Sequence, residues 1–408
     1  MRGKARFIGV CVLVIPLVFY VTLAGAADKK PVKMLSAMAL SGPAGAVPET
    51  GWGFVDAGDY INRTGGIGGR PFVAILEDGR VEVPTTLGIF NRYVAKESKD
   101  ELLFYCQYNS MALKAMHDQI NKEEKIPVLA GTMSAVIFND KVRETSPYFF
   151  STGPGWGEQW GMVLNYIKKH HKKSTPPRVA YHFIDNSSGR DPMEATKKYA
   201  KKFGVDIVML EPFSPTAQTF APAFLKFRKN KIEYILFQNY SFKIGARYFK
   251  EAKKYIPQIP LYGVHWTAAN LYFHVVGAAY DNHYVVHGYP VETELDNKFV
   301  QIVTKMAKEK GRKVRAWTLY MQSWMMAQTA AAAARQVVRE GKPLTRDNCR
   351  DALENLKNFD MLGMYGGATL DYSTHKHSRS RMLRADWSKK TLVPLTDWHN
   401  LSEYLGEK

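Results

Sequence analysis

The sequence contains little cysteine and lacks the short motifs of several common enzyme classes. Only three of its 408 residues are cysteines, and Cys11 lies in an apolar N-terminal run, which leaves Cys106 and Cys349. Two cysteines form at most one disulfide bond, so stability must come from a hydrophobic core; one bridge and two reduced thiols both remain open. The chain contains no Walker loop and no CxxC, HExxH or GxSxG motif. Nothing therefore indicates nucleotide hydrolysis, thiol exchange, zinc proteolysis or serine hydrolysis.

Long hydrophobic runs are absent after residue 26. Before it, three basic residues precede the apolar run Phe7–Ala26, which Pro16 interrupts and which ends in Ala-Gly-Ala. This order of positive charge, apolar core and small residues is typical of a secretory signal peptide. We expect residues 1–26 to be a signal peptide cleaved after Ala26, and the mature chain to be exported and soluble. A retained N-terminal anchor is the alternative.

Acidic residues are few relative to basic ones. The chain has 38 aspartates and glutamates against 56 lysines and arginines, a net charge of +18. Such an excess can indicate nucleic-acid binding. The basic residues are dispersed, however, apart from one cluster at Lys168–Lys173 that runs into Ser174–Pro177, and no recognition motif accompanies them. A solvated helix end and loop explains the cluster, and we expect no nucleic-acid partner.

The rest of the chain alternates short apolar runs with amphipathic stretches of helical period. Ten runs are predicted strands: Val32–Ala39, Phe72–Glu77, Leu102–Gln107, Pro127–Ala130, Tyr148–Ser151, Arg178–Ile184, Asp206–Pro212, Tyr234–Gln238, Leu261–Val264 and Tyr284–Tyr289. Ten stretches between and after them are predicted helices: Gly53–Arg63, Pro84–Lys96, Ala112–Glu124, Glu158–His170, Pro192–Phe203, Phe220–Asn230, Lys243–Lys254, Asn297–Lys310, Leu319–Arg339 and Thr345–Asn355. These spacings suit the crossovers that join parallel strands, so the sequence predicts an α/β protein.

Neither the glycines nor the histidines indicate a cofactor or a metal. The cluster Gly65–Gly69 follows a predicted helix and precedes a strand, whereas a dinucleotide-binding fingerprint needs the opposite order. We therefore interpret it as a helix end followed by a turn. The pair His170-His171 lies in the lysine cluster, and His375 and His377 lie in a polar stretch. We expect no cofactor, no metal and no catalytic residue, and so no enzyme.

Four segments near the start of the mature chain occur in a characteristic order. They are Leu40–Gly45, a helix ending in Tyr60–Arg63, the turn Gly65–Pro71 and a strand ending in Glu77-Asp78. In these segments the chain resembles the periplasmic leucine/isoleucine/valine-binding protein family, the type I solute-binding proteins of ABC transporters. Later segments keep the family's order: Ser110 with Ala115, Ile126–Val128 before Gly131–Ala135, Arg178–Asp185, Asn239-Tyr240, and Trp317 with Tyr320.

The resemblance implies a type I periplasmic binding protein fold, with two Rossmann-like lobes of parallel sheets joined by a three-strand hinge. It places lobe 1 at 28–151 plus 290–362 and lobe 2 at 152–289 plus 363–408. Glycine and proline cluster at the three expected crossovers, Ser151–Gly155, Gly288–Pro290 and Leu362–Gly367. The ligand is expected in the cleft, because open parallel sheets bind ligands at the carboxyl ends of their strands.

The resemblance also implies a function. The chain is expected to be a monomeric periplasmic receptor of an ABC importer, with a small-molecule ligand and with permease and ATPase subunits in the inner membrane as partners. Two other classes stay open: a ligand-sensing module that signals to a membrane partner, and an enzyme on the same scaffold. The sequence shows no nucleophile with a paired base that would favour the enzyme.

In the family, backbone amides and hydroxyls hold a ligand carboxylate. The resemblance assigns this role to Ser110 and to the loop Thr132, Met133, Ser134 and Ala135. The alternative is that Ser110 and Ser134 only cap the helices that follow them.

Aromatic residues are expected to complete the wall of the site. Tyr240 matches a wall residue from the second lobe, and Trp156 lies just past the first crossover between glycines. Tyr320 and Trp317 are expected near the cleft as well. Packing in the core is the alternative for Trp156, Trp317 and Tyr320.

One position departs from the family. Members that bind amino acids have an acidic residue after the strand matching Leu261–Val264, where it pairs with the ligand ammonium. Here His265 follows that strand, and no acid occurs before Asp281. A buried ammonium without a carboxylate partner is costly. The ligand is therefore expected to be a small hydrophobic or aromatic carboxylate, or a branched-chain amino-acid-like molecule, that carries no essential ammonium.

His265 itself is expected to donate to a carboxylate or a phenol, with an affinity that falls as pH rises through about 6.5. The alternative is a slip in the alignment, after which Asp185, Asp191 or Glu211 reaches the pocket from another loop.

Overall fold

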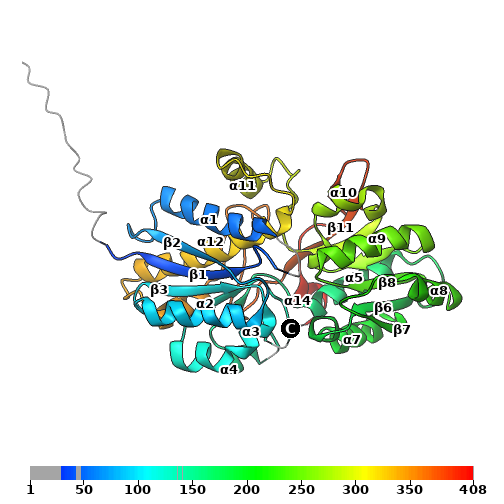
Figure 1. Cartoon of the computed structure of the whole chain (residues 1–408), viewed down its shortest axis with the longest axis horizontal. Helices are drawn as coiled ribbons and strands as arrows, with labels where there is room; N and C mark the ends of the chain where they lie inside the picture. Colours follow the sequence, from blue (N-terminus) through cyan, green and yellow to red (C-terminus); the bar gives the residue numbers. More distant parts are fainter. Residues whose placement is uncertain (1–28, 43–46, 136, 140, 408) are drawn as a thin grey trace, which may run out of the picture.

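A computed structural model describes residues 29–42, 47–135, 137–139 and 141–407. The predicted signal peptide over residues 1–26 lies outside this range. The described chain forms two lobes side by side, each built around one β-sheet (Figure 1). None of its helices combines the length and the apolar character that crossing a membrane requires.

The first lobe is built on a parallel sheet in the order β2-β1-β3-β4-β5. Its strands are β1 (Val32–Met38), β2 (Phe72–Asp78), β3 (Leu102–Gln107), β4 (Val128–Ala130) and β5 (Phe149–Ser151). Its early helices are α1 (Pro48–Arg63), α2 (Val83–Lys96), α3 (Ser110–Ala115), η1 (Gln119–Glu124) and α4 (Val142–Thr145). Three later helices pack on the same lobe: α11 (Lys298–Glu309), α12 (Trp317–Arg339) and α13 (Arg346–Glu354).

The second lobe is built on a mixed sheet in the order β12-β11-β10-β9-β8-β6-β7, with β13 paired to β11. The parallel strands are β6 (Arg178–Ile184), β7 (Asp206–Phe213), β8 (Tyr234–Gln238), β9 (Leu261–Gly263) and β10 (His283–His287). The antiparallel strands are β11 (Arg379–Asp386), β12 (Thr391–Pro394) and β13 (His399–Asn400). Its helices are α5 (Trp156–His170), α6 (Ser187–Arg190), α7 (Met193–Phe203), α8 (Ala221–Lys229), α9 (Phe242–Tyr255), η2 (His265–Thr267), α10 (Leu271–Val276), η3 (Gly277–Tyr280) and α14 (Leu401–Tyr404).

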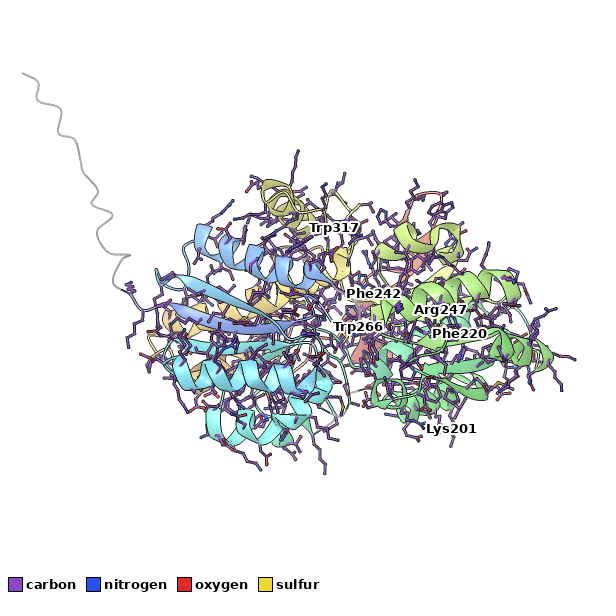
Figure 2. All side chains as sticks on the ribbon, viewed as in Figure 1. Lys201, Phe220, Phe242, Arg247, Trp266 and Trp317 are labelled. Carbon is purple, nitrogen blue, oxygen red and sulfur yellow. The ribbon has the colours of Figure 1, made fainter. Side chains whose placement is uncertain are left out.

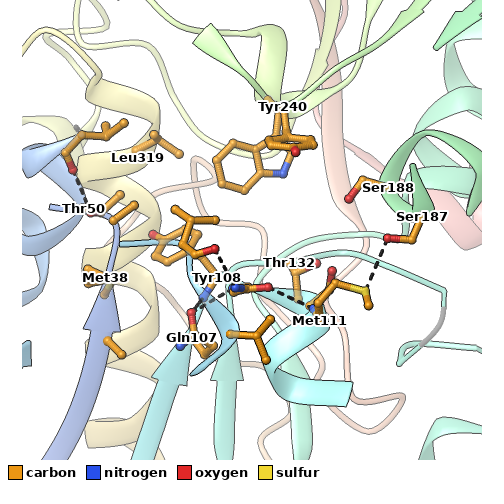
Figure 3. A pocket seen from close by; sticks show the side chains of 18 of the residues that line it. Met38, Thr50, Gln107, Tyr108, Met111, Thr132, Ser187, Ser188, Tyr240 and Leu319 are labelled. Atoms are coloured by element: carbon orange, nitrogen blue, oxygen red, sulfur yellow. Dashed lines mark hydrogen bonds between the residues drawn. The ribbon is translucent and has the colours of Figure 1, made fainter. Parts of the chain in front are cut away.

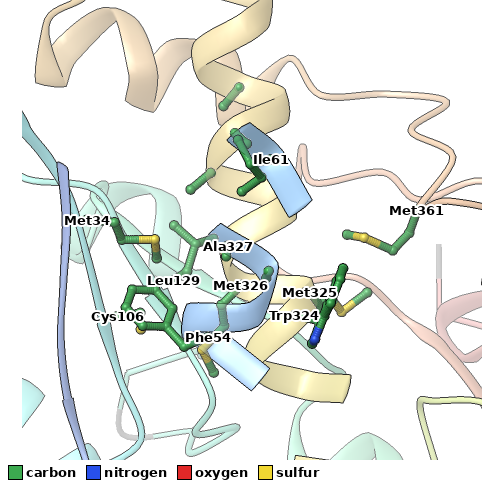
Figure 4. Packing of buried hydrophobic residues seen from close by; sticks show 14 of the residues in the cluster. Met34, Phe54, Ile61, Cys106, Leu129, Trp324, Met325, Met326, Ala327 and Met361 are labelled. Carbon is green, nitrogen blue, oxygen red and sulfur yellow. The ribbon is translucent and has the colours of Figure 1, made fainter. Parts of the chain in front are cut away.

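Helix α12 forms the centre of the first lobe's core. Figure 4 shows Trp324, Met325, Met326 and Ala327 of this helix packed with residues of β1, β3, β4 and α1. The alanine-rich sequence of α12 lets α1 approach closely, and at Gly53 an added Cβ would lie 2.2 Å from the Tyr320 carbonyl oxygen. The buried cysteines Cys106 and Cys349 belong to the same core, and both are free thiols.

Three segments cross between the two sheets, after β5, after β10 and before β11. Hydrogen bonds join these segments: Ser151 N–H donates to the His375 carbonyl over 2.7 Å, and Tyr289 Oη donates to the Thr152 carbonyl over 2.7 Å. The predicted fold class is thereby confirmed. The antiparallel strands β11 to β13 are an addition that the sequence did not predict, because Arg379–Asp386 lacks a continuous apolar run.

The third crossing lies near the C-terminus of the chain. Residues up to Tyr372 pack in the core of the first lobe, and the chain returns to the second sheet at Arg379, where β11 begins. The exact division of the chain into lobes at 151, 290 and 362 stays a prediction.

Candidate functional site

A cavity of about 330 Å³ lies between the lobes at the carboxyl ends of their parallel strands. The first lobe contributes Met38 at the end of β1, Gln107 at the end of β3 with the four residues after it, and Thr132 after β4 (Figure 3). The second lobe contributes Asn186–Ser188 after β6, and Tyr240 and Trp266 after β8 and β9. The strand order of each sheet therefore brings these loops together.

The two lobes touch each other around this cavity. Ser187 Oγ of the second lobe donates to Met111 Sδ of the first over 3.4 Å (Figure 3). The rings of Tyr108 and Trp266 meet edge to face with centroids 5.9 Å apart. Figure 2 shows Trp266 and Phe242 where the second lobe faces the first. The structure therefore presents a cavity that both lobes enclose.

The cavity wall is aromatic and uncharged. All 21 described residues that line it lack an ionised side chain at neutral pH, and five are aromatic: Tyr108, Trp156, Tyr240, Phe242 and Trp266. Apolar side chains such as Met38, Val83 and Leu319 fill much of the remaining wall. A wall of this composition favours an apolar or aromatic ligand body with few polar groups.

The polar floor of the cavity is held by hydrogen bonds within the loop after β3. Gln107 Oε1 accepts from the backbone N–H groups of Tyr108 and Asn109, over 2.7 and 2.8 Å. Asn109 is the N-cap of α3, because its Oδ1 accepts from Met111 N and Ala112 N. Ser110 is therefore not the cap, and its hydroxyl makes no hydrogen bond within the described residues. Ser110 lines the cavity, and its hydroxyl can therefore donate to a ligand.

Two indole N–H groups at the cavity also lack acceptors. Trp156 and Trp266 both line it, and the Nε1 of each is buried without a hydrogen-bond partner among the described residues. Trp156 is 4% exposed and begins α5, where Glu158 caps the helix by accepting from Gly155 N over 2.6 Å. Leaving a buried donor unpaired costs about 1–3 kcal/mol. A ligand that supplies a hydrogen-bond acceptor to these two indole N–H groups would therefore remove this cost.

Four long helices begin at the cavity. Val47 is the N-cap of α1, Trp156 and Phe242 are the first residues of α5 and α9, and Leu319 is in the first turn of α12. The N-terminus of a helix carries a partial positive charge. The site can therefore stabilise a negative or polar ligand head without a basic side chain.

Four of the nine predicted site residues line the cavity: Ser110, Thr132, Trp156 and Tyr240. The neighbouring loop residues lie outside its lining. Met133 is buried and its Sδ accepts from Gln159 Nε2 over 3.0 Å, and Ser134 is also buried. The backbone N–H of Ala135 donates to Asp191 Oδ2 of the second lobe.

Tyr320 and His265 also lie outside the lining. The Tyr320 hydroxyl donates to Asp56 Oδ2 over 2.8 Å in the first lobe, which matches the core alternative. His265 is 2% exposed, and its Nε2 lies 3.3 Å from Gln322 Oε1. Burial lowers the pKa of His265 to about 4, so it stays neutral near pH 6.5, and the expected titration there was wrong.

Sequence reasoning missed several lining residues. Trp266 directly follows His265, and the short helix η2 turns these neighbours in different directions, with 72° between their rings. Gln107 is the last residue of β3, and Asn186–Ser188 and Phe242 follow the ends of β6 and β8. The rule that ligands lie beyond the carboxyl ends of parallel strands would have found them.

The three acids considered as alternative ammonium partners are engaged elsewhere. Asp185 pairs with Arg190, Glu211 with Lys226, and Asp191 accepts from the Ala135 amide. None of them lines the cavity. Among the described residues, no group of three or more His, Cys, Asp and Glu side chains is arranged to hold a metal ion.

The fold is shared with solved binding proteins of transporters. A branched-chain amino acid ABC transporter protein from Thermus thermophilus with bound valine aligns at 20% identity and a TM-score of 0.81, covering 92% of this chain and 99% of its own. A fatty acid ABC transporter substrate-binding protein from Thermomonospora curvata aligns at 14% identity and 0.76, covering 92% and 94%. An isoleucine complex of the branched-chain amino acid binding protein of Streptococcus pneumoniae aligns at 17% and 0.72, covering 90% and 99%.

Comparison with curated proteins gives no match. The family model described as periplasmic binding protein matches residues 31–390, which is most of the chain. Proteins of this family and fold are ligand-binding components of ABC transporters rather than enzymes. The chain therefore belongs to the periplasmic binding protein family.

Proposed function

We propose that this protein is the periplasmic solute receptor of an ABC importer, and that it binds a small hydrophobic or aromatic carboxylate with no essential ammonium. The ligand occupies the cavity between the lobes, and the permease and ATPase subunits are the downstream partners. The receptor acts as an exported monomer. The observation that carries the ligand class is the absence of any acidic side chain among the described residues that line the cavity.

The lack of acidic side chains in the described lining of the cavity disfavours a simple amino acid as the ligand. A buried ammonium needs a carboxylate or several strong acceptors to replace its hydration, because an unpaired buried charge is destabilised by several kcal/mol. In the segment after β9, Trp266 lines the cavity. The polar atom of its side chain, Nε1, donates a hydrogen bond and cannot accept one. Such a wall disfavours an ammonium.

The same wall favours a carboxylate or another acceptor head. The hydroxyls of Ser110 and Thr132 lie on the first-lobe side, and the indoles of Trp156 and Trp266 lie on the second. All four can donate, and the helix N-termini add positive potential. The remaining aromatic and aliphatic wall would cover an apolar ligand body.

The neighbouring structures are compatible with both ligand types. Two of them are named for branched-chain amino acids and one for a fatty acid. The fold thus accommodates acids with and without an amine, so the choice depends on the side chains of this cavity.

A paired ligand screen tests the proposal. The mature protein is titrated calorimetrically with leucine against 4-methylpentanoate, and with phenylalanine against 3-phenylpropionate, so that each pair differs in the ammonium group. We expect the amine-free member of at least one pair to bind and raise the melting temperature, because a ligand that binds only the native state stabilises it. Micromolar binding of the amino acids with no binding of the acids would refute the ligand class.

Two variants localise the binding. Trp266→Ala removes a wall residue and should weaken binding of the ligand found in the screen by about tenfold or more. Trp387→Ala removes an indole of the same lobe that packs against Phe273 away from the cavity, and should leave affinity unchanged. Equal effects of the two variants would show that the ligand does not occupy this cavity.

A further inference from the structure

The positive charge of the chain is concentrated in one part of the second lobe. Residues 166–260 contain 19 lysines and arginines against 7 aspartates and glutamates, a net charge of +12 out of +18 for the whole chain. The cavity has no charged lining residue, so this charge does not serve ligand binding there. It requires a separate explanation.

The topology gathers most of these basic residues at one edge of the sheet. Helices α5, α7, α8 and α9 each precede one of the parallel strands β6 to β9, so all four helices end where the strands begin. Each helix ends in basic residues, and two of the following loops continue them. The resulting basic edge consists of exposed side chains in Lys168–Lys173, Lys201-Lys202, Lys226–Lys231 and Lys253-Lys254. Figure 2 shows Lys201 at the margin of the second lobe, away from the first.

Direct contacts show that the loops after α5 and α8 adjoin one another. His171 Nδ1 lies 2.9 Å from Tyr234 Oη, which joins the end of α5 to the start of β8. Arg178 Nη2 donates to the Asn230 carbonyl over 3.0 Å. A groove of about 530 Å³ opens between them, and Lys172, Lys173, Arg228 and Lys231 line it together with a single acid, Glu233.

The cavity and the basic edge lie at opposite ends of the same sheet. Strand β6 runs from Arg178 at the basic edge to Ile184 next to the cavity. At about 3.3 Å per residue, the two features are about 20 Å apart. A partner at the basic edge would therefore leave the cavity accessible.

The corresponding edge of the first lobe has no such excess. There the helix ends and loops mix lysines with acids, as in Lys96–Glu101 and Lys122–Lys125. Ion pairs neutralise several of them, including Lys33 with Glu97 and Lys99 with Glu124. The fold itself thus does not require an uncompensated positive edge.

Helix dipoles explain only part of the second lobe's charge. A basic residue in the last turn of a helix is favourable, which accounts for one or two lysines per helix. Lys172, Lys173 and Lys231 lie beyond the helix ends. Lys173 pairs with Glu233, but Lys172, Arg228, Lys229 and Lys231 make no ion pair within the part of the chain that the structure describes.

We propose that the basic edge of the second lobe binds the surface of a membrane rich in anionic phospholipid. The charges are spread over four helix ends and two of the loops that follow them instead of converging on one point, which matches an array of phosphate groups rather than a single small anion. Lysine and arginine side chains near such a surface gain electrostatic attraction that salt screens. Tyr234 lines the groove and belongs to the residue types that favour the lipid interface.

Vesicle co-sedimentation of the mature chain tests the proposal. Vesicles of phosphatidylcholine alone are compared with vesicles containing about one third phosphatidylglycerol, at about 50 mM and about 300 mM salt. We expect binding only to the anionic vesicles, and at least about a tenfold loss of partitioning at the higher salt.

Two quadruple variants distinguish a site from bulk charge. Changing Lys172, Arg228, Lys229 and Lys231 to glutamine should reduce partitioning by about tenfold or more. Changing the exposed Lys96, Lys114, Lys125 and Lys141 of the first lobe to glutamine removes the same charge and should have little effect. Melting temperatures of both variants verify folding.

Three outcomes would overturn the proposal: no binding to anionic vesicles at low salt, equal losses in the two variants, or tighter binding to duplex DNA than to the vesicles. Each is independent of the cavity ligand, because the measurements use the protein without it.

Discussion

The backbone N–H of Ala135 donates a hydrogen bond to Oδ2 of Asp191 over 2.8 Å. Ala135 lies in the loop after β4 of the first lobe, and Asp191 follows α6 of the second. The bond therefore joins the two lobes at the rim of the cavity. It would break if the lobes separated, so it contributes only to the closed arrangement.

Replacing Asp191 with alanine should weaken ligand binding. We expect Asp191→Ala to raise the Kd of the ligand found in the screen by about fivefold, mainly through faster dissociation, because a hydrogen bond of this kind contributes about 1 kcal/mol. Stopped-flow and calorimetric titrations measure the two quantities. Asp185→Ala is the matched control, since Asp185 pairs with Arg190 inside the second lobe. Equal effects would contradict a role in closure.

The adjacent residues Asn109 and Ser110 should separate stability from binding. Asn109→Ala removes the cap of α3 and should lower the free energy of unfolding by about 1 kcal/mol. Ser110→Ala removes a hydroxyl without a protein partner, so it should leave stability within about 0.5 kcal/mol and weaken ligand binding. Denaturant unfolding and calorimetry test both. A loss of stability in Ser110→Ala would instead favour the capping alternative.

Acid should destabilise the protein from about pH 6.5 downward. Burial lowers the pKa values of His182 and His283 to about 3 and those of His265 and His377 to about 4. Between these values and the unfolded value of about 6.5, the unfolded chain binds protons that the native chain does not. The contribution of these neutral histidines to the free energy of unfolding is therefore present above pH 6.5 and is lost as the pH falls below it. The loss is about 1 kcal/mol per histidine between pH 6.5 and 5.5.

Thermal unfolding across this range measures the effect. His182→Asn should lower the free energy of unfolding at every pH. It should also make that free energy fall less steeply with acid, by about the contribution of one histidine. Between pH 7 and 8 the curves of the two proteins should run parallel. A pH dependence that the substitution leaves unchanged would contradict the assignment.

The two core thiols should be unreactive in the native protein. Burial raises the pKa of Cys106 to about 12 and that of Cys349 well above its usual value, so both stay protonated at pH 8. A thiol reagent should modify neither in the folded mature chain and both after denaturation. Rapid modification of either thiol in the native state would contradict their burial.

Two glycines in the consecutive helices α1 and α2 should respond oppositely to alanine. Gly53→Ala brings a Cβ against the Tyr320 carbonyl and should destabilise the protein by about 1–3 kcal/mol. Gly88 lies in α2 with nothing within 4 Å of an added Cβ, so Gly88→Ala should stabilise by about 0.5–1 kcal/mol. Denaturant unfolding compares them. Similar effects at the two positions would contradict the close packing of α1 on α12.

The central parallel strands were predictable because they are buried on both faces. Leu102–Gln107 is a continuous apolar run, and its predicted bounds match β3. Arg379–Asp386 pairs in an antiparallel sheet near the hinge and carries arginines between its apolar residues, so its pattern gave no strand signal. Helix α3 is shorter than predicted, since Met116 ends it and a π-helical turn follows.

The site was less predictable because it depends on the direction of single side chains. Ser110 and Tyr240 reach the cavity from strand ends, where the resemblance placed them. His265 and Trp266 occupy consecutive positions, and only the three-dimensional path of η2 decides which of them faces the cavity. Contact of these residues with a ligand stays a prediction.

The order in which the core of the first lobe is completed has a consequence for synthesis. The last strand of its sheet ends at Ser151, yet helix α12, which covers one face of that sheet, ends only at Arg339. Strands β6 to β10 of the second lobe and the helices between them are made in between. A growing chain must therefore keep a large apolar sheet face uncovered for more than 150 residues, so completion of the first lobe is late and aggregation of the nascent chain is its main hazard.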